Sequence, residues 1–471
     1  MKILLINLPN RYQDKTRKEV FFPVGLGYVA GAILEARHEV EILDIYALGL
    51  SDEKVMSIIK DNVFDVIGIS AMSTQYKYVK WLASKIKELH KDKEIILGWV
   101  LATYSAKIVL ETTDVDICVI GEGENTIKEL LANLNNLSGV KGIAYKSGVE
   151  IEVNPPREYI KDLHSLPRIP YEIFPMDIYI DKLSHSGLSQ GQKTLNISCG
   201  RGCPYECTFC SKSFSGIRLR PIKDIMEEIS FLKTKYGVRR IFFSDELLIT
   251  NKNRILEICE NISPLKVSWS CQGRINLIDE EILRKMKQSG CTSIGYGIES
   301  ASQKILNAMN KKIEIKKAEE IIKFTKKAGL KPVLQFTFGY PGEDMLTIKE
   351  TIEFFRRVDE PFVEFSPITP LPGSPLWDDC VNNKIIKDEV TFLENLEGGY
   401  MSDAPTLVNF TSFEPEELNR LRIWSENRIR LNYMKKHPLY ALGLVKNKLI
   451  NEGISGTYKK FTTLLKGISY V

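Results

Sequence analysis

The sequence predicts an α/β protein with an N-terminal doubly wound parallel sheet (Rossmann-like), a partial (βα)6 barrel and a mostly helical C-terminal region. Two observations support this prediction. Short apolar runs alternate with amphipathic helical stretches in two separate parts of the chain, and the alternation ends near residue 377. We therefore expect regions at residues 1–136, 137–190, 191–377 and 378–471.

In the first region, the strands are predicted at residues 3–7, 40–44, 65–70, 94–98 and 116–121. Ligands of doubly wound sheets bind at the carboxyl ends of the strands. Glycines gather at those ends, at Gly25, Gly27, Gly98 and Gly121. Glycine allows a ligand to approach the backbone closely, although it also serves ordinary turns.

The second region reads as a hairpin at 142–153 followed by a linker that carries five prolines. In the third region the alternation resumes, with strands predicted at 194–199, 240–245, 267–272, 293–299, 333–338 and 363–368. The amphipathic stretch 315–329, which a glycine ends, is a typical helix between them. Six such units suit an open barrel, whose site lies at the carboxyl ends of the strands.

Three cysteines follow the first barrel strand with CxxxCxxC spacing, at Cys203, Cys207 and Cys210. Three thiolates close only three irons of a cubane cluster, which leaves one iron open to an exchangeable ligand. A zinc site normally needs a fourth Cys or His ligand, which this run does not supply. Cys199 lies four residues upstream and is either a fourth ligand or a small packed residue at a strand end.

The cysteine spacing with its Pro-Tyr and Phe neighbours resembles the radical S-adenosylmethionine (SAM) superfamily. This resemblance implies a [4Fe–4S] cluster that binds SAM and cleaves it reductively to a 5′-deoxyadenosyl radical. It covers residues 194–345 and implies SAM-binding roles for Phe209, Asp245, Glu246, Arg274, Glu299 and Gly339. Each acidic residue of this set also fits a helix cap.

Segments 23–28, 68–74, 98–103 and 121–124 resemble the cobalamin-binding domain that precedes many radical SAM barrels. The resemblance implies a cobalamin site at Gly25, Leu26, Gly27, Ser70, Thr74, Gly98, Gly121 and Glu122. Two features depart from that pattern. No Asp-x-His-x-x-Gly element supplies a histidine for cobalt, and Trp99 follows Gly98 where a second glycine is common. A scaffold domain without cobalamin is the alternative.

Among the remaining cysteines, only Cys271 is a candidate catalytic thiol, because it lies one residue before the end of a predicted barrel strand; packing is the alternative. The segment 420–471 holds eleven Lys and Arg against two acidic residues. A basic amphipathic surface of this kind binds anionic lipid or an acidic substrate, and it is also typical of a solvated helix face. Membrane contact would be peripheral, and nucleic acid is a weaker expectation.

The 471 residues carry a net charge of +4 and nine cysteines, an odd number that favours a reducing compartment. The N-terminal apolar run is too short for a signal peptide, and no apolar run approaches the ~18 residues that span a bilayer. We expect a cytoplasmic protein.

Taken together, these resemblances imply a cobalamin-dependent radical SAM methyltransferase that acts at an unactivated carbon of a small-molecule or lipid-like substrate. Flavodoxin or ferredoxin would supply its electrons. A radical SAM oxidative cyclase or C–C coupling enzyme without methyl transfer is the alternative. A non-enzymatic corrinoid carrier or iron–sulfur sensor is the alternative from another class.

Overall fold

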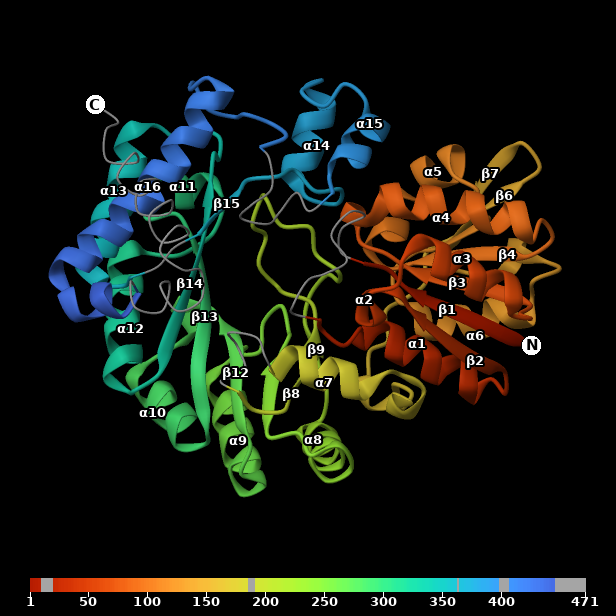
Figure 1. Ribbon diagram of the computed structural model, residues 1–471, viewed down its shortest axis with the longest axis horizontal. Helices are drawn as coiled ribbons and strands as arrows, with labels where there is room; N and C mark the ends of the chain where they lie inside the picture. The colour runs from red at the N-terminus through yellow and green to blue at the C-terminus, as the bar shows by residue number, and fades with distance from the viewer. Residues whose placement is uncertain (10–19, 185–190, 362–363, 398–405, 445–471) are drawn as a thin grey trace.

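Two largely parallel sheets dominate the computed structural model, which describes residues 1–9, 20–184, 191–361, 364–397 and 406–444. Figure 1 shows the barrel on the left and the N-terminal sheet on the right, with the C-terminal helices at the top and along the upper left side of the barrel. The α/β class predicted from the sequence is confirmed.

The N-terminal sheet has seven strands in the order β2-β1-β3-β4-β5-β6-β7. Its first five strands are parallel: β1 (Lys2–Asn7), β2 (Glu39–Asp44), β3 (Val66–Ser70), β4 (Glu94–Gly98) and β5 (Ile117–Val119). Helices connect them: α1 (Val24–Glu35), α2 (Ile45–Leu48), α3 (Asp52–Asp61), α4 (Tyr76–Leu89), α5 (Trp99–Thr112) and α6 (Gly123–Ala132). Strand β2 lies on one side of β1, whereas β3 and the strands after it lie on the other side. Such a switch in strand order opens a crevice at the carboxyl ends of the strands.

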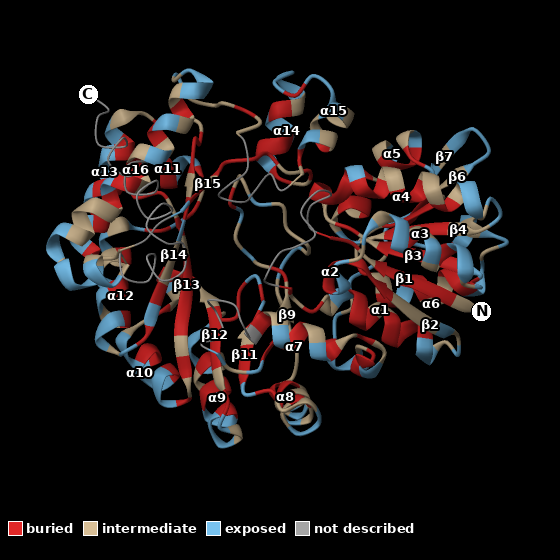
Figure 2. Ribbon diagram, viewed as in Figure 1, coloured by how far each residue is buried: buried red, intermediate tan, exposed pale blue. Residues whose placement is uncertain are grey.

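Both faces of this sheet are buried, as its apolar strands require. Along β1, Ile3 and Leu5 pack into one hydrophobic cluster, whereas Leu4 and Ile6 pack into a second cluster on the opposite face. Figure 2 shows the strands of both sheets as largely buried.

The hairpin expected in the linker region belongs instead to this sheet. Strands β6 (Ile143–Ser147) and β7 (Glu150–Val153) extend it with antiparallel pairing, in which Val119 of β5 lies opposite Ile143. The sheet is therefore not parallel throughout. The pairing satisfies the edge of the short strand β5, which would otherwise leave its backbone groups unpaired.

The barrel sheet has six parallel strands in the order β15-β14-β13-β12-β11-β8. In chain order they are β8 (Thr194–Ile197), β11 (Arg240–Phe243), β12 (Ser268–Gly273), β13 (Cys291–Glu299), β14 (Lys331–Phe338) and β15 (Phe365–Pro367). The helices between them are α8 (Ile222–Tyr236), α9 (Lys252–Ile262), α10 (Glu280–Gln288), α11 (Gln303–Ala308), α12 (Ile315–Lys327) and α13 (Met345–Val358). The predicted strand 363–368 is shorter in the structure, and residue 363 lies outside the described residues.

Helix α7 (Met176–Ser184) precedes the barrel, and α14 (Pro375–Asn382), α15 (Glu389–Asn395) and α16 (Pro415–Lys436) follow it. Leu418, Leu421 and Ile429 of α16 are buried in the large cluster that forms the barrel core. Residues 445–471, which hold part of the basic segment, lie outside the described residues. No helix in the described part of the chain is long and apolar enough to cross a membrane.

Candidate active site

The three CxxxCxxC cysteines lie in one loop, residues 202–217, which we call the cysteine loop. Two short antiparallel strands close its neck, β9 (Gly200–Arg201) and β10 (Arg218–Leu219), in which Arg201 pairs with Arg218. The neck follows β8 directly, so the loop leaves the barrel at the carboxyl end of its first strand, where barrel sites lie.

Backbone contacts hold the cysteine loop against later parts of the barrel. The Thr208 N–H donates to the carbonyl of Met309 at 3.1 Å, and the Leu376 N–H donates to the carbonyl of Thr208 at 2.8 Å. The Thr208 and Tyr340 hydroxyls are hydrogen-bonded at 2.6 Å. The middle of the loop is therefore attached to the segments that follow α11 and β14 and to the start of α14.

Cys203 and Cys207 both act electrostatically on the thiol of Cys210. Cys207 is buried, while Cys203 and Cys210 are more open, and all three are free thiols. Desolvation, followed by the charges of Cys207 and Glu246, raises the pKa of Cys210 to about 12, whereas Lys311 lowers it. A group that takes up three such thiolates must supply positive charge, as the irons of a cluster do.

Across the described ranges, no group of three His, Cys, Asp or Glu side chains could hold a single metal ion. The fit of the three cysteines to a cluster therefore rests on their shared loop, the influence of Cys203 and Cys207 on Cys210, and two cations nearby, Lys311 and Arg274.

Gly202 precedes the first cluster cysteine in a left-handed conformation, with φ of +84°. A Cβ here would lie 2.5 Å from the carbonyl oxygen of Gly216 and 3.1 Å from that of Phe214. We expect the Gly202→Ala variant to hold little iron after reconstitution. The added methyl group would overlap these carbonyl oxygens, and the left-handed φ would cost about 1–2 kcal/mol more. Gly216→Ala is the matched control, since its φ is +69° but its Cβ would meet nothing. Equal iron content in the two variants would contradict the expectation.

Cys199 and Cys271 are both packed in the barrel core rather than aimed at the cluster. Each is buried, and burial raises the pKa of each thiol well above its usual value. A neutral, buried thiol is a poor nucleophile and a poor ligand. The burial of Cys271 favours the packing alternative, and a catalytic role for its thiol stays a prediction.

Asp245 follows β11 and is 5 % exposed. One of its oxygens accepts the backbone N–H of Cys199 at 2.7 Å, while Oδ2 has no partner among the described residues. Burial raises the pKa of Asp245 to about 7, although the N–H groups of Cys199 and Gly200 oppose the shift. Its neighbour Glu246 is exposed and accepts the Ser213 N–H at 3.1 Å. Asp245 therefore holds the backbone at Cys199, just before the neck of the cysteine loop, and its predicted contact with SAM stays a prediction.

Arg274 is buried against the cysteine loop. Its guanidinium lies 3.5 Å from the ring centroid of Tyr205, Nη1 lies 4.0 Å from the Cys207 sulfur, and Nη2 donates to the carbonyl of Lys311. Nε has no partner in the part of the chain that the structure describes. Most of this side chain therefore faces the loop, and its predicted grip on the carboxylate of SAM stays a prediction.

Glu299 ends β13 at a bulge and has a left-handed φ of +72°, an uncommon conformation for a residue other than glycine. It pairs with Lys311 at 2.9 Å, and both side chains are nearly buried. The Lys311 ammonium also lies 5.5 Å from the ring centroid of Phe209. That ring packs against a group of buried hydrophobic side chains that includes Tyr340. Sequence reasoning missed Lys311, because it lies in a loop without a recognisable motif.

Gly339 follows β14 with a φ of +90°, and its N–H donates to Glu343 at 2.6 Å. Burial raises the pKa of Glu343 to about 7. The folded state therefore holds a proton that the unfolded state loses, and stability falls as the pH rises between the two pKa values.

We expect Glu343→Gln to remove this pH dependence while keeping an acceptor for Gly339. Relative to the variant, the unmodified protein should lose about 2 kcal/mol of unfolding free energy between pH 5 and pH 7, at 1.36 kcal/mol per pKa unit. Urea unfolding of both proteins without iron measures the difference. Parallel pH profiles would show that Glu343 titrates normally.

A large cavity lies between the N-terminal sheet and the cysteine loop. It encloses about 1550 Å³ of empty space, part of it open to solvent, and its lining is mostly apolar. From the N-terminal sheet it is lined by Gly25, Leu26, Ser70, Gly98, Trp99, Gly121 and Glu122, and from the barrel by Ser198, Gly202, Phe214, Asp245 and Glu246. We call this space the interdomain cavity.

Six of the eight residues expected to bind cobalamin line this cavity, whereas Gly27 and Thr74 do not. Gly27 packs against Phe22 and Ile169, where a Cβ would come within 2.9 Å of the Ile169 side chain. Thr74 is buried, and its hydroxyl has no partner among residues that the structure describes. A concave site with a mostly apolar lining, a glycine-rich wall and a few polar side chains fits the binding of a cofactor.

Trp99 occupies the start of α5 with a φ of +73° and is 45 % exposed. The backbone there has the conformation that favours glycine, even though the residue is tryptophan. Trp99 is among the residues that line the interdomain cavity.

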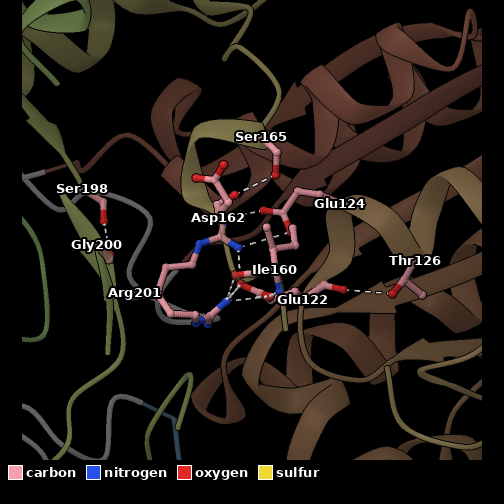
Figure 3. A network of polar contacts seen from close by, with 10 residues as sticks. Glu122, Glu124, Thr126, Ile160, Asp162, Ser165, Ser198, Gly200 and Arg201 are labelled. Atoms are coloured by element: carbon pink, nitrogen blue, oxygen red, sulfur yellow. Dashed lines mark hydrogen bonds and ion pairs between the residues drawn. The ribbon is translucent and has the colours of Figure 1, made fainter. Parts of the chain in front are cut away.

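Glu122 has partners in the protein itself. Its carboxylate lies 2.6 Å from Arg201 and 2.8 Å from Arg218, and it accepts the Ile160 N–H at 2.6 Å (Figure 3). The sequence gives no sign of this long-range pairing, although Arg201 lies only two residues before Cys203.

Family models match twice: the radical SAM superfamily over residues 197–355 and the B12 binding domain over residues 15–131. The first match implies a [4Fe–4S] cluster and SAM, and the second implies cobalamin.

The chain is 32 % identical over 400 residues to an uncharacterised methyltransferase of Pyrococcus horikoshii, which covers 82 % of this chain and 84 % of that protein. It is 25 % identical over 432 residues to the anaerobic magnesium-protoporphyrin IX monomethyl ester cyclase of Cereibacter sphaeroides, with 88 % and 67 % covered. A similar solved fold is that of the radical SAM methyltransferase TsrM from Kitasatospora setae, with cobalamin and a [4Fe–4S] cluster bound. Its TM-score is 0.67 at 16 % identity, covering 81 % of this chain and 78 % of that one.

Proposed function

We propose that this chain, which belongs to the radical SAM superfamily and carries a B12-binding domain, is a cobalamin-dependent methyltransferase that acts at an unactivated carbon. The observation that carries the proposal is the interdomain cavity, which is lined both by the carboxyl edge of the N-terminal sheet and by the cysteine loop. A cofactor in the cavity would lie beside the site of SAM cleavage.

When bound, the cluster and SAM supply a radical that removes a substrate hydrogen, and cobalamin supplies a methyl group. Cys203, Cys207 and Cys210 would hold the cluster and leave one iron for SAM. The free oxygen of Asp245 suits the ammonium of SAM, because a charge-assisted hydrogen bond would satisfy a buried acceptor. Gly339, which follows β14, would offer glycine backbone near the adenine ring of SAM.

The N-terminal residues of the cavity would position the second cofactor. Gly25, Gly98 and Gly121 bring backbone to the cavity wall without side chains, so a cofactor could approach the backbone closely there. Neither His38 nor His90 lines the cavity, so no histidine among the lining residues is placed to bind cobalt.

Radical SAM enzymes act on small molecules and take electrons from reductants. We infer a small-molecule or lipid-like substrate and a flavodoxin or ferredoxin as donor. Peripheral membrane contact through the basic C-terminal region rests on its composition alone.

An oxidative cyclase or C–C coupling enzyme is the second candidate, favoured by the similarity to the magnesium-protoporphyrin cyclase over 88 % of this chain. Such an enzyme would use the radical without transferring a methyl group.

The two candidates differ in the products of SAM. Anaerobic protein with reconstituted iron, hydroxocobalamin and a low-potential reductant should convert SAM to both 5′-deoxyadenosine and S-adenosylhomocysteine, because methyl transfer to cobalt leaves the homocysteine product. Omitting hydroxocobalamin should remove S-adenosylhomocysteine alone. Deoxyadenosine without S-adenosylhomocysteine in the loaded protein would favour the cyclase. The absence of both products would favour the corrinoid carrier or iron–sulfur sensor.

A further inference from the structure

Four charged side chains join the N-terminal sheet to the neck of the cysteine loop. Glu122 and Glu124 lie at the start of α6, and Arg201 and Arg218 are the paired residues of β9 and β10. We call these four residues the Glu–Arg network. Because β9 and β10 close the loop that holds all three cluster cysteines, the network grips that loop where it enters and where it leaves.

The geometry of the network is tight. Arg201 lies 2.6 Å from Glu122 and 2.5 Å from Glu124, so one guanidinium bridges both carboxylates (Figure 3). Arg218 donates to both oxygens of Glu122, at 2.8 and 2.9 Å, and to the carbonyl of Ile160 at 2.7 Å. Aromatic rings cover the guanidinium groups: Tyr159 lies 4.7 Å from Arg218, and Phe214 lies 5.4 Å from each arginine.

The network is also buried, with side-chain exposures of 4 % for both glutamates, 9 % for Arg201 and 14 % for Arg218. Buried ion pairs add little net stability compared with apolar contacts, because desolvation offsets their attraction. Their directional hydrogen bonds, however, specify one arrangement of the two partners. Fixing the arrangement of the two partners therefore explains the two carboxylates and two guanidiniums at this interface better than added stability does.

The N-terminal domain makes a second contact with the cysteine loop, just after Cys210. The hydroxyl of Tyr104, on α5, donates to the carbonyl of Lys212 at 2.5 Å. A Cβ at Gly373 would overlap the Tyr104 ring, so the ring lies closely against the segment before α14. The N-terminal domain thus contacts the loop on both sides of the run from Cys203 to Cys210.

We propose that the Glu–Arg network and Tyr104 are positioning residues that fix the cysteine loop relative to the interdomain cavity. The inference rests on the proposed function, in which the cavity and the loop hold cofactors that must stay at a set separation. Glu122 and Glu124 would serve this purpose through their ion pairs with the neck of the loop. Both glutamates also line the interdomain cavity, and the expected contact of Glu122 with cobalamin stays a prediction.

The test uses full-length protein with reconstituted cluster, without SAM or substrate. Glu124→Gln removes one charge from Arg201 and leaves Glu122 in place. Glu129→Gln is the matched control on the same helix, because it breaks the ion pair with Arg157 and touches neither arginine of the neck. Tyr104→Phe removes a single hydroxyl at a half-exposed site, so this variant should fold even where a network variant does not.

We expect Glu124→Gln to lose iron to a chelator about tenfold faster than the unmodified protein. Removing a contact that supports metal ligands typically weakens metal binding by about that factor or more. Hydrogen exchange should accelerate at residues 199–219 and stay unchanged in the barrel strands. Tyr104→Phe should accelerate exchange only near Lys212, and Glu129→Gln should match the unmodified protein.

Unchanged iron loss and exchange in both Glu124→Gln and Tyr104→Phe would overturn the proposal. So would faster exchange throughout both sheets, because it would mean that the network only stabilises the fold. These measurements need no turnover. An unmodified protein that forms no S-adenosylhomocysteine would refute the methyltransferase and leave this comparison valid.

Discussion

Alanine at Cys203, Cys207 or Cys210 is expected to abolish formation of 5′-deoxyadenosine from SAM, whereas Cys199→Ala should retain it. Each of the three thiolates would close one iron, and a cluster with two remaining ligands is not held at the end of the barrel. Cys199 is packed in the core with a raised thiol pKa, so its loss removes one small buried group.

Iron content and deoxyadenosine are measured together on the four anaerobically reconstituted variants. The three loop variants should form at least about 100-fold less deoxyadenosine than the unmodified protein. A loss of about 100-fold is already the upper end of the effect of removing an outer contact of a metal ligand. Two results would contradict the account: a Cys203→Ala protein that still cleaves SAM, or a Cys199→Ala protein that loses its iron like the other three.

The second large effect is expected at Gly25, where a side chain would enter the interdomain cavity. The residue lines the cavity from α1, and a Cβ built there has no atom within 4 Å. Gly25→Leu should therefore fold normally and lose cobalamin, because overpacking a filled site costs about 1–3 kcal/mol. That cost corresponds to about tenfold to hundredfold weaker binding.

Gly25→Ala is the control, since one methyl group in open space should change cobalamin binding little. Binding of hydroxocobalamin is followed by its visible absorption after desalting, and iron content reports on the cluster in the same samples. If Gly25→Leu keeps cobalamin, then the cofactor does not use this wall of the cavity. If iron is lost as well, the substitution has disturbed more than the cavity.

Local patterns account for what the sequence predicts well. Alternating apolar runs place the parallel strands, and the spacing of Cys203, Cys207 and Cys210 indicates a cluster loop without any knowledge of the fold. The carboxyl ends of the strands bring Gly25, Ser70 and Gly98 to one cavity, because parallel strands end at one edge.

Contacts between distant segments explain what the sequence does not predict. Glu122 pairs with arginines 79 and 96 residues away, and no local pattern marks such partners. The hairpin β6–β7 joins the first sheet because the edge of β5 accepts it. The position of Cys271 near a strand end leaves open which way its thiol faces, and only packing shows that it is buried in the core.

The most direct test of the central claim is metal analysis of the protein after anaerobic reconstitution with iron, sulfide and hydroxocobalamin, followed by desalting. A protein that holds a cluster on the cysteine loop and cobalamin in the interdomain cavity should contain about four irons and one cobalt per chain. Iron without cobalt would contradict the claim: the cavity beside Trp99 would then belong to a domain that no longer binds its cofactor, and the cyclase would become the better account.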